Sequence, residues 1–306
     1  DATDLDINFY DSNRAALGTF NLYFVFSDRT AGRLLYKLSN AVVNEAAMDF
    51  DIDGIATINW SGMAGQIKEV PTGLGVGQVT AQNTFPNPGA AGALWIDTND
   101  SDKLYISTSA TNAEASWYGN ISEGSTNTGN FIRNRLTNLT LAPETAFQTA
   151  TTFDREGTGT ADDNYRDSYS VAITGGNVTI SNNISYLTPE ELGKVNQPIE
   201  HVTGTRTVSG SLTCYLASSD AATNRSKNLF QDLVSDVNTV INKFAITLQV
   251  GGTDATKPRF EINLPTAHFE IPSHSIEDVI SLETSFHGLG SGVGEGDEIT
   301  LKYIGV

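Results

Sequence analysis

The sequence predicts a mainly β protein in which one β unit occurs twice and a single α-helix flanks the second copy. Apolar and polar residues alternate over long stretches, above all from 169 to 216, and a period of two is typical of half-buried strands. Only one segment changes to a spacing of three and four. In addition, a hairpin near the N-terminus aligns with one near the C-terminus, which indicates an internal repeat.

The first predicted strand begins at Phe20. Its apolar residues stand at alternate positions, Phe20, Leu22, Phe24 and Phe26, so the strand is expected to be buried on at least one face. A turn is predicted at 28–32, a second strand through 34–38 and a third over about 50–60.

The hairpin near the C-terminus, over 244–264, repeats this pattern with a slightly longer turn. The aligned pairs are Arg33 with Arg259, Leu38 with Leu264, Ala41 with Ala267, Val43 with Phe269, Trp60 with Phe286 and Gly62 with Gly288. We interpret this as a duplication. The first copy lacks counterparts of residues 169–243, so its N-terminal strands are expected to be missing from this sequence or supplied by another segment or chain.

Between the two copies, from 66 to 130, the composition changes to Gly, Thr, Ser and Asn, as in a connector. A small hairpin is predicted inside it over Gly92–Ser107, around an Asn-Asp-Ser-Asp turn. The aromatic residues Trp95, Tyr105 and Trp117 are interpreted first as the core of this hairpin, and the alternative is a ligand site.

In the second copy, strands are predicted on both sides of a turn at Gly175-Gly176 and again from 208 to 216. Residues 187–203 contain two prolines and scattered apolar side chains, which predicts a long loop with apolar groups to bury elsewhere. Loops of this size are usually functional. Farther on, apolar residues at 230, 233, 237 and 241 predict an amphipathic helix from about Ser226 to Asn242.

Three segments carry a resemblance to bacteriophage tail tube proteins. They are N-N-I-S-Y-L-T-P-E-E-L-G at Asn182–Gly193, G-T-R-T-V-S-G-S-L-T-C-Y-L at Gly204–Leu216 and I-N-L-P-T-A-H-F-E-I-P-S-H-S-I-E-D-V-I-S-L-E-T-S-F at Ile262–Phe286. The resemblance covers roughly residues 169–303. It implies a mainly β, duplicated tail-tube β-barrel/sandwich with one flanking α-helix and a small β-hairpin insertion, polymerised as stacked rings around a DNA channel.

Three regions follow from the repeat and the resemblance. Residues 1–66 are predicted to form a partial first tube-like domain, without its N-terminal strands. Residues 67–130 form the connector with the hairpin insertion, and residues 131–306 form a second, complete tube-like domain.

The resemblance implies a structural subunit of the phage tail in the virion, assembled in the host bacterial cytoplasm, through which genomic DNA passes without specific binding. Implied partners are copies of the chain itself, in stacked rings of three or six, and other tail proteins: the tape measure, the terminator, the baseplate or tip and, in a contractile tail, the sheath. The alternative is a virion or extracellular β-sandwich binding module that recognises carbohydrate or a host surface.

The predicted loop supplies the candidate subunit interface, because a ring-forming barrel can dock such loops into the next ring. The candidate residues are Leu187, Pro189, Glu190, Leu192, Val195, Pro198, Ile199 and His201.

Other site classes find little support. Cys214 is the only cysteine and lies among apolar residues, which predicts a buried thiol and no intramolecular disulfide. The segment Asp49–Gly54 begins like a calcium loop, but Trp60 stands where a bidentate Glu is required. His268, Glu270 and His274 are too few for a zinc site. No catalytic motif and no cofactor is predicted.

Composition limits the partners further. No apolar run approaches the ~20 residues that span a bilayer, and the N-terminus lacks the pattern of a signal peptide. The net charge is −18, which argues against gripping nucleic acid through phosphate neutralisation. We expect the acidic surplus on the channel wall, where it keeps DNA mobile. The alternative places it in exposed loops such as 97–102 and 162–167, for solubility alone.

Overall fold

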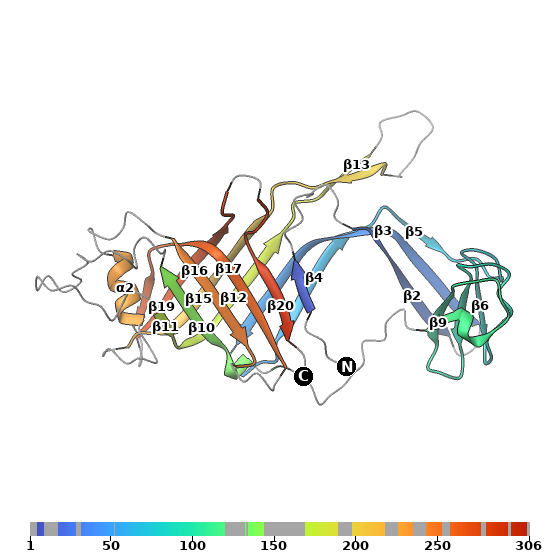
Figure 1. The fold of residues 1–306 in the computed structure, drawn as a ribbon, viewed down its shortest axis with the longest axis horizontal. Coiled ribbons are helices and arrows are strands. Elements are labelled where there is room, and N and C mark those ends of the chain that lie inside the picture. The colour runs from blue at the N-terminus through green and yellow to red at the C-terminus, as the bar shows by residue number, and fades with distance from the viewer. Residues whose placement is uncertain are drawn as a thin grey trace, which may run out of the picture.

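The computed structural model describes residues 5–8, 18–28, 32–51, 53–119, 132, 134–143, 169–188, 198–217, 226–234, 243–252, 258–276, 280–292 and 295–304. Strands dominate these residues, which confirms the mainly β prediction. The molecule is elongated, with helix α2 (Ser226–Val234) at one end and a small sheet at the other (Figure 1).

Three sheets contain the strands. The large sheet comprises β1 (Leu5–Asn8), β2 (Phe20–Asp28), β3 (Gly32–Asp51), β4 (Thr57–Met63), β5 (Gln66–Glu69), β10 (Asn138–Pro143), β11 (Tyr169–Val171), β12 (Ile173–Ser181), β15 (Thr207–Tyr215), β16 (Phe244–Val250), β17 (Arg259–Phe269), β18 (Ser273–Ile276), β19 (Ile280–Leu289) and β20 (Thr300–Ile304). The small sheet comprises β6 (Val79–Gln82), β7 (Leu94–Asp97), β8 (Lys103–Ser107) and β9 (Trp117–Gly119), and β13 (Ser185–Leu187) pairs with β14 (Glu200–Val202). The described residues also contain the 3-10 turns η2 (Glu114–Ser116) and η3 (Asn134–Leu136).

The large sheet folds over on itself as a sandwich. Its main path runs β11-β10-β16-β17-β19-β15-β12-β3-β2, with β1, β4, β5, β18 and β20 attached beside it. The two end strands, β11 and β2, do not pair with each other in the described part of the chain. The described strands therefore form no closed barrel, and of the predicted barrel/sandwich the structure shows the sandwich.

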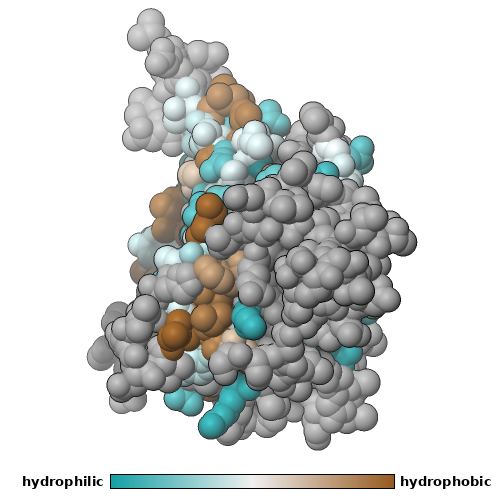
Figure 2. All heavy atoms as spheres, turned by 90° about the vertical axis from the view of Figure 1, so that its left-hand side faces the viewer, coloured by the Kyte–Doolittle hydropathy of each residue, from teal (hydrophilic) through white to brown (hydrophobic). Residues whose placement is uncertain are grey.

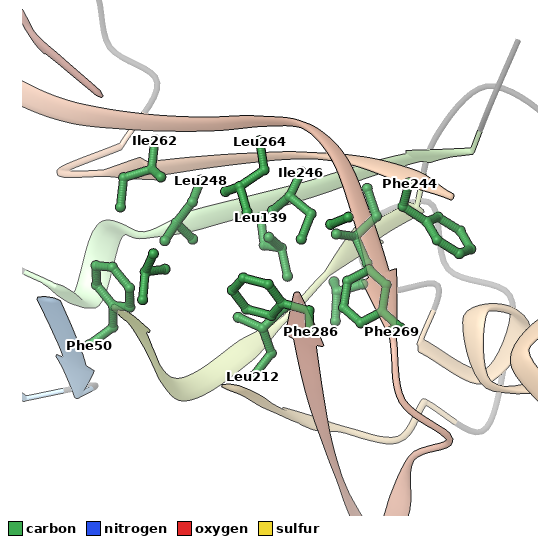
Figure 3. Close-up of a cluster of buried hydrophobic side chains, with 14 of the residues drawn as sticks. Phe50, Leu139, Leu212, Phe244, Ile246, Leu248, Ile262, Leu264, Phe269 and Phe286 are labelled. Carbon is green, nitrogen blue, oxygen red and sulfur yellow. The ribbon is translucent and has the colours of Figure 1, made fainter. Parts of the chain in front are cut away.

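The main core lies between two layers of this sheet. In Figure 3, Ile246, Leu248 and Leu264 of β16 and β17 face Leu212 of β15 and Phe286 of β19. Strand β16 shows the reason: its residues alternate between buried and half-buried because a strand sends every second side chain to the same face. The period-two pattern in the sequence therefore predicted the core-facing side of β16 correctly.

Two parts of the large sheet share one pairing pattern. Strand β3 pairs with β2, β4 and β5, and β17 pairs with β16, β19 and β20. The registers agree: Phe20 pairs with Ala41 and Leu22 with Leu38, as Phe244 pairs with Ala267 and Ile246 with Leu264. Both pairings carry an irregularity between those two positions. Residues of β2 and β3 that align with β16 and β17 thus pair alike, whereas Val43 pairs with Gly62 and its aligned residue Phe269 pairs with Phe286.

Two predictions of local structure are wrong. Gly175-Gly176 is not a turn, because β12 runs through both glycines and pairs them with Asp51 and Phe50 of β3. Glycine is required at 176 for another reason: a Cβ atom there would clash with the carbonyl oxygen of Ser211 on β15. The predicted strand over 50–60 is interrupted, since β3 ends at Asp51 and β4 begins at Thr57.

The small hairpin in the connector forms as expected. Strands β7 and β8 pair around residues 98–102, and β6 and β9 extend them to four strands. Trp95 stacks on Tyr105 with ring centroids 4.7 Å apart and meets Trp117 edge-on at 5.8 Å. Both tryptophans are buried. These aromatic side chains pack together on one face of the small sheet, which agrees with their interpretation as part of its core.

The predicted helix begins at Ser226 as α2, and residues 235–242 of the prediction lie outside the described residues. The Ser226 hydroxyl donates to the carbonyl oxygen of Tyr215 at 2.8 Å and accepts from the Ala217 N–H at 2.8 Å. Leu229 and Leu233, one helical turn apart, are buried in the main core. The helix therefore closes one end of the sandwich (Figure 1).

Cys214 lies on the core side of β15, as predicted, and burial raises the pKa of its thiol to about 11. Because the thiolate is the reactive form, we expect iodoacetamide at about pH 8 to modify Cys214 very slowly in the folded protein and rapidly in denaturant. Intact-mass spectrometry over time measures this. Rapid modification without denaturant would mean that β15 is open to solvent.

Candidate assembly surfaces

A two-stranded hairpin projects from the large sheet between β12 and β15 (Figure 1). We call residues 185–202 the arm; of these, 185–188 and 198–202 are described. Its strands β13 and β14 are antiparallel, with Tyr186 opposite His201. The segment predicted as a long loop therefore leaves and re-enters the sheet as a paired hairpin.

Hydrogen bonds fix the base of the arm to the middle of β3. The Ile184 N–H donates to Oδ1 of Asn44 at 2.8 Å, and the Asn182 side-chain amide donates to the carbonyl oxygen of Val43 at 3.1 Å. The Tyr186 hydroxyl donates to the carbonyl oxygen of Asn40 at 2.7 Å. These bonds set the direction in which the arm leaves the body.

The described part of the arm exposes apolar side chains. Leu187 is 53% exposed, Ile199 66% and Val202 48%. Figure 2 shows hydrophobic residues on the arm at the top of the view. The described members of the predicted interface are Leu187, Pro198, Ile199 and His201, and Pro189, Glu190, Leu192 and Val195 lie outside the described residues.

Burial raises the pKa of Tyr186, so its hydroxyl stays a donor well above neutral pH. We expect Tyr186→Phe to lower the free energy of unfolding by about 0.5–1.5 kcal/mol, because the bond to Asn40 is lost while the ring keeps its packing against His201. Urea unfolding measures the change. The matched control is Tyr36→Phe, and an equal loss there would leave the bond at the arm base without a special role.

A buried ion pair lies beside the arm. It was not predicted from the sequence. Arg206 and Glu298 are each 8% exposed, and Nη1 of Arg206 lies 3.7 Å from Oε2 of Glu298. The Nε of Arg206 also donates to Oδ1 of Asn182 at 3.1 Å. Arg206 stands in the segment that carries the family resemblance, but nothing in the sequence connects it with Glu298. The pair ties the arm base to the segment before β20.

Six neighbouring strands, in the order β4-β3-β12-β15-β19-β18, present one polar face opposite the core. We call it the polar face; its hydroxyl and amide residues are Thr57, Asn59, Ser61, Asn177, Thr179, Ser181, Thr207, Ser209, Ser211, Thr213, Ser281 and Ser285. These residues alternate with the core residues along each strand. The sequence predicted the strand at 208–216 but not this surface, which depends on the order of the strands in the sheet.

The charges on the polar face are almost all negative. It carries the carboxylates Glu45, Asp49, Asp51 and Glu283, and no Lys or Arg among its described residues. Its basic side chain is His287, whose Nε2 lies 3.6 Å from Oε1 of Glu270. Asp49 and Asp51 thus belong to the solvent side of a strand. Across the described ranges no three His, Cys, Asp or Glu side chains lie close enough to hold a metal ion.

Membrane insertion through a helix finds no support in the described part of the chain, where no helix has the length and apolar character needed to cross a bilayer.

Comparison with known proteins gives one strong similarity. The chain is 28% identical over 303 residues to the tail tube protein pb6 of Escherichia phage T5, an alignment that covers 99% of this chain and 51% of pb6. The chain thus spans about half the length of this curated relative. The resemblance to tail tube proteins inferred from the sequence is confirmed.

Two further comparisons add little detail. No protein-family model matches the chain. Among solved structures, the SPP1 tail tube determined by solid-state NMR and cryo EM is similar with a TM-score of 0.34 and 14% identity, over 57% of this chain and 80% of that one. That similarity is too low to compare individual strands.

Proposed function

We propose that this chain is a structural subunit of a phage tail tube, which polymerises as stacked rings around a channel for genome delivery. The similarity to pb6 along nearly the whole chain supports the proposal. The polar face also supports the proposal, because a wide sheet with hydroxyl, amide and carboxylate groups is a suitable wall for a channel that DNA must traverse. The role is structural and not catalytic.

The proposal includes two tube-wall units in one chain. Residues 1–66 contribute a partial unit and residues 131–306 a complete one, with 67–130 as the insertion between them. The equal registers of β2–β3 and β16–β17 support this duplication. A ring that single-unit relatives close with six copies then closes with three chains. Closure of such a ring requires a head-to-tail interface.

Electron microscopy of the purified protein, combined with a mass measurement of single rings, tests the proposal. We expect tubes, and three chains in each ring. Six full chains in a ring would overturn the duplication argument but leave the tube assignment intact. A protein that stays monomeric over a wide range of concentration and salt would count against the tube itself.

The arm is the proposed contact between stacked rings. Its exposed apolar residues are not used by the body of the subunit, and it projects away from the sandwich (Figure 1). The same proposal places the protein in the virion after assembly in the host bacterial cytoplasm, next to the tape measure, the terminator, the baseplate or tip and, in a contractile tail, the sheath.

The polar face is expected to keep duplex DNA mobile, because it offers no Lys or Arg in its described part to replace the counterions of DNA. We expect no retention of duplex DNA by assembled tubes, even at about 50 mM salt, in a filter-binding assay. The triple variant Glu45→Lys, Asp49→Lys, Asp51→Lys should bind DNA at low salt and release it near 200 mM. Tight low-salt binding by the unmodified protein would disprove an acidic wall.

A further inference from the structure

The sheet formed by β2, β3 and β5 has one covered and one open apolar face. On the covered face, Tyr23, Val25 and Leu35 pack against the small sheet. The open face carries large apolar side chains that are between 36% and 64% exposed: Phe20, Leu22, Phe24, Phe26, Leu34 and Ile67. Cross-strand pairs such as Leu22 with Leu38 and Leu38 with Ile67 show that they form one continuous surface. A surface of this kind is rarely left in contact with water.

The equivalent face of the second unit is core. Phe20, Leu22, Phe24 and Phe26 correspond in register to residues that are at most 6% exposed: Phe244, Ile246, Leu248 and Val250. Trp60 of β4 aligns with Phe286 of β19. Trp60 is 53% exposed, whereas Phe286 is 1% exposed and lies against the core (Figure 3). The open face is therefore a core face without its opposite layer.

The opposite layer in the second unit identifies what is absent. Strands β12 and β15 form an antiparallel pair, and Val178, Ile180, Val208 and Leu212 from them enter the core beneath β16 and β17. Strand β15 also pairs with the edge of β19. In the first unit, β4 pairs only with β3 among the described strands, so the edge that corresponds to the β15-bearing edge of β19 is open.

We propose that this face and the open edge of β4 bind a two-stranded antiparallel β-hairpin of the same construction as β12–β15. One of its strands pairs with β4 as β15 pairs with β19, and alternate apolar residues cover Phe20 to Phe26 and Trp60. A second copy packing its own open face here would cover the phenylalanines but leave the β4 edge unpaired, so a hairpin is the better occupant. The inference rests on the duplication and not on tube formation.

A fusion protein tests this inference. In the fusion, an additional copy of residues 169–217 is placed ahead of Gly18. A Gly/Ser linker as long as the segment between Leu216 and Phe244 joins the two. The protein then has two hairpins, one for the core of the second unit and one for the open face of the first. We expect amide exchange in β2 and β4 to slow by about tenfold or more, and the fluorescence of a hydrophobic dye to fall severalfold, relative to the unfused chain. Neither readout depends on tubes.

Two matched variants make the result specific. In the first, Val178, Ile180, Val208 and Leu212 of the added hairpin alone become Thr; in the second, the fusion carries Phe24→Asp on the exposed surface. Both should abolish the protection, while Ile271→Ser, at an exposed apolar residue outside the face, should leave it unchanged. Protection that survives the Thr variant, or a fusion without effect, would overturn the proposal. So would a dimer of the unfused chain that Phe24→Asp dissociates and the added hairpin does not displace.

Discussion

Replacing residues 187–203 by a short Gly/Ser linker is expected to abolish tube formation and to leave a folded subunit. The arm joins the body through hydrogen bonds at its base, and Leu187, Ile199 and Val202 face solvent, so the main core loses nothing when they are removed. Association between rings, in contrast, should lose the apolar contact that we propose for the arm. Negative-stain microscopy shows whether tubes form. Circular dichroism and urea unfolding show whether the subunit is folded.

The matched variant for this experiment keeps the length of the arm. Leu187→Ser, Ile199→Ser and Val202→Ser together should prevent tubes as the linker does, whereas Glu200→Gln, on the same strand as Val202, should assemble normally. Normal tubes from the linker variant would remove the arm from the interface. Loss of folding in the linker variant with normal tubes from the serine variant would assign the arm to the subunit's own stability.

Arg206→Ala is expected to lower the free energy of unfolding by about 3–5 kcal/mol, because it removes a buried cation that lies 3.7 Å from the buried carboxylate of Glu298. The Asn182 side chain loses a donor at the same time, which loosens the base of the arm. Urea unfolding gives the free energy. Assembly should weaken along with it, since Asn182 also holds the arm to β3 through Val43.

An exposed ion pair provides the control for this result. Lys103 lies 2.8 Å from Asp100, with side chains 37% and 47% exposed, and Lys103→Ala should cost at most about 1 kcal/mol. The double variant Arg206→Met with Glu298→Leu should recover most of the loss, because a well-packed apolar pair avoids burying a charge. A loss below about 1 kcal/mol in Arg206→Ala would show that water reaches Glu298.

Sequence periodicity recovered the strands with clear alternation, such as β2, β15 and β16, and the start of the helix, because those features are local. Phe244 to Val250 alternate in the sequence as they do between core and second face in the structure. Prediction from periodicity failed where the neighbouring strands determine the backbone conformation. Gly175-Gly176 has the composition of a turn, yet β3 on one side and β15 on the other hold both glycines in an extended strand.

The candidate site was predicted in part for the same reason. The apolar residues of the arm could be recognised in the sequence because they do not fit the alternation of a strand. Leu187 and Ile199 are exposed in the structure. Arg206 and Glu298 gave no such signal, because an ion pair between distant segments leaves no trace in either one alone. The polar face could not be predicted without the order of the strands in the sheet. That order brings Asp49 on β3 into one surface with Glu283 on β19.

Strand β3 has a mechanical consequence. It runs for 20 residues and pairs with β2 in its first half and with β12 in its second, so one unbroken backbone connects the end that bears the small sheet with the sandwich (Figure 1). A pull along this strand loads its ladder hydrogen bonds in shear, many at once, and the two halves meet without a loop, at the irregular pairing around Asn40. In the proposed tube, we expect bending to occur at the contacts between chains and each subunit to move largely as one body.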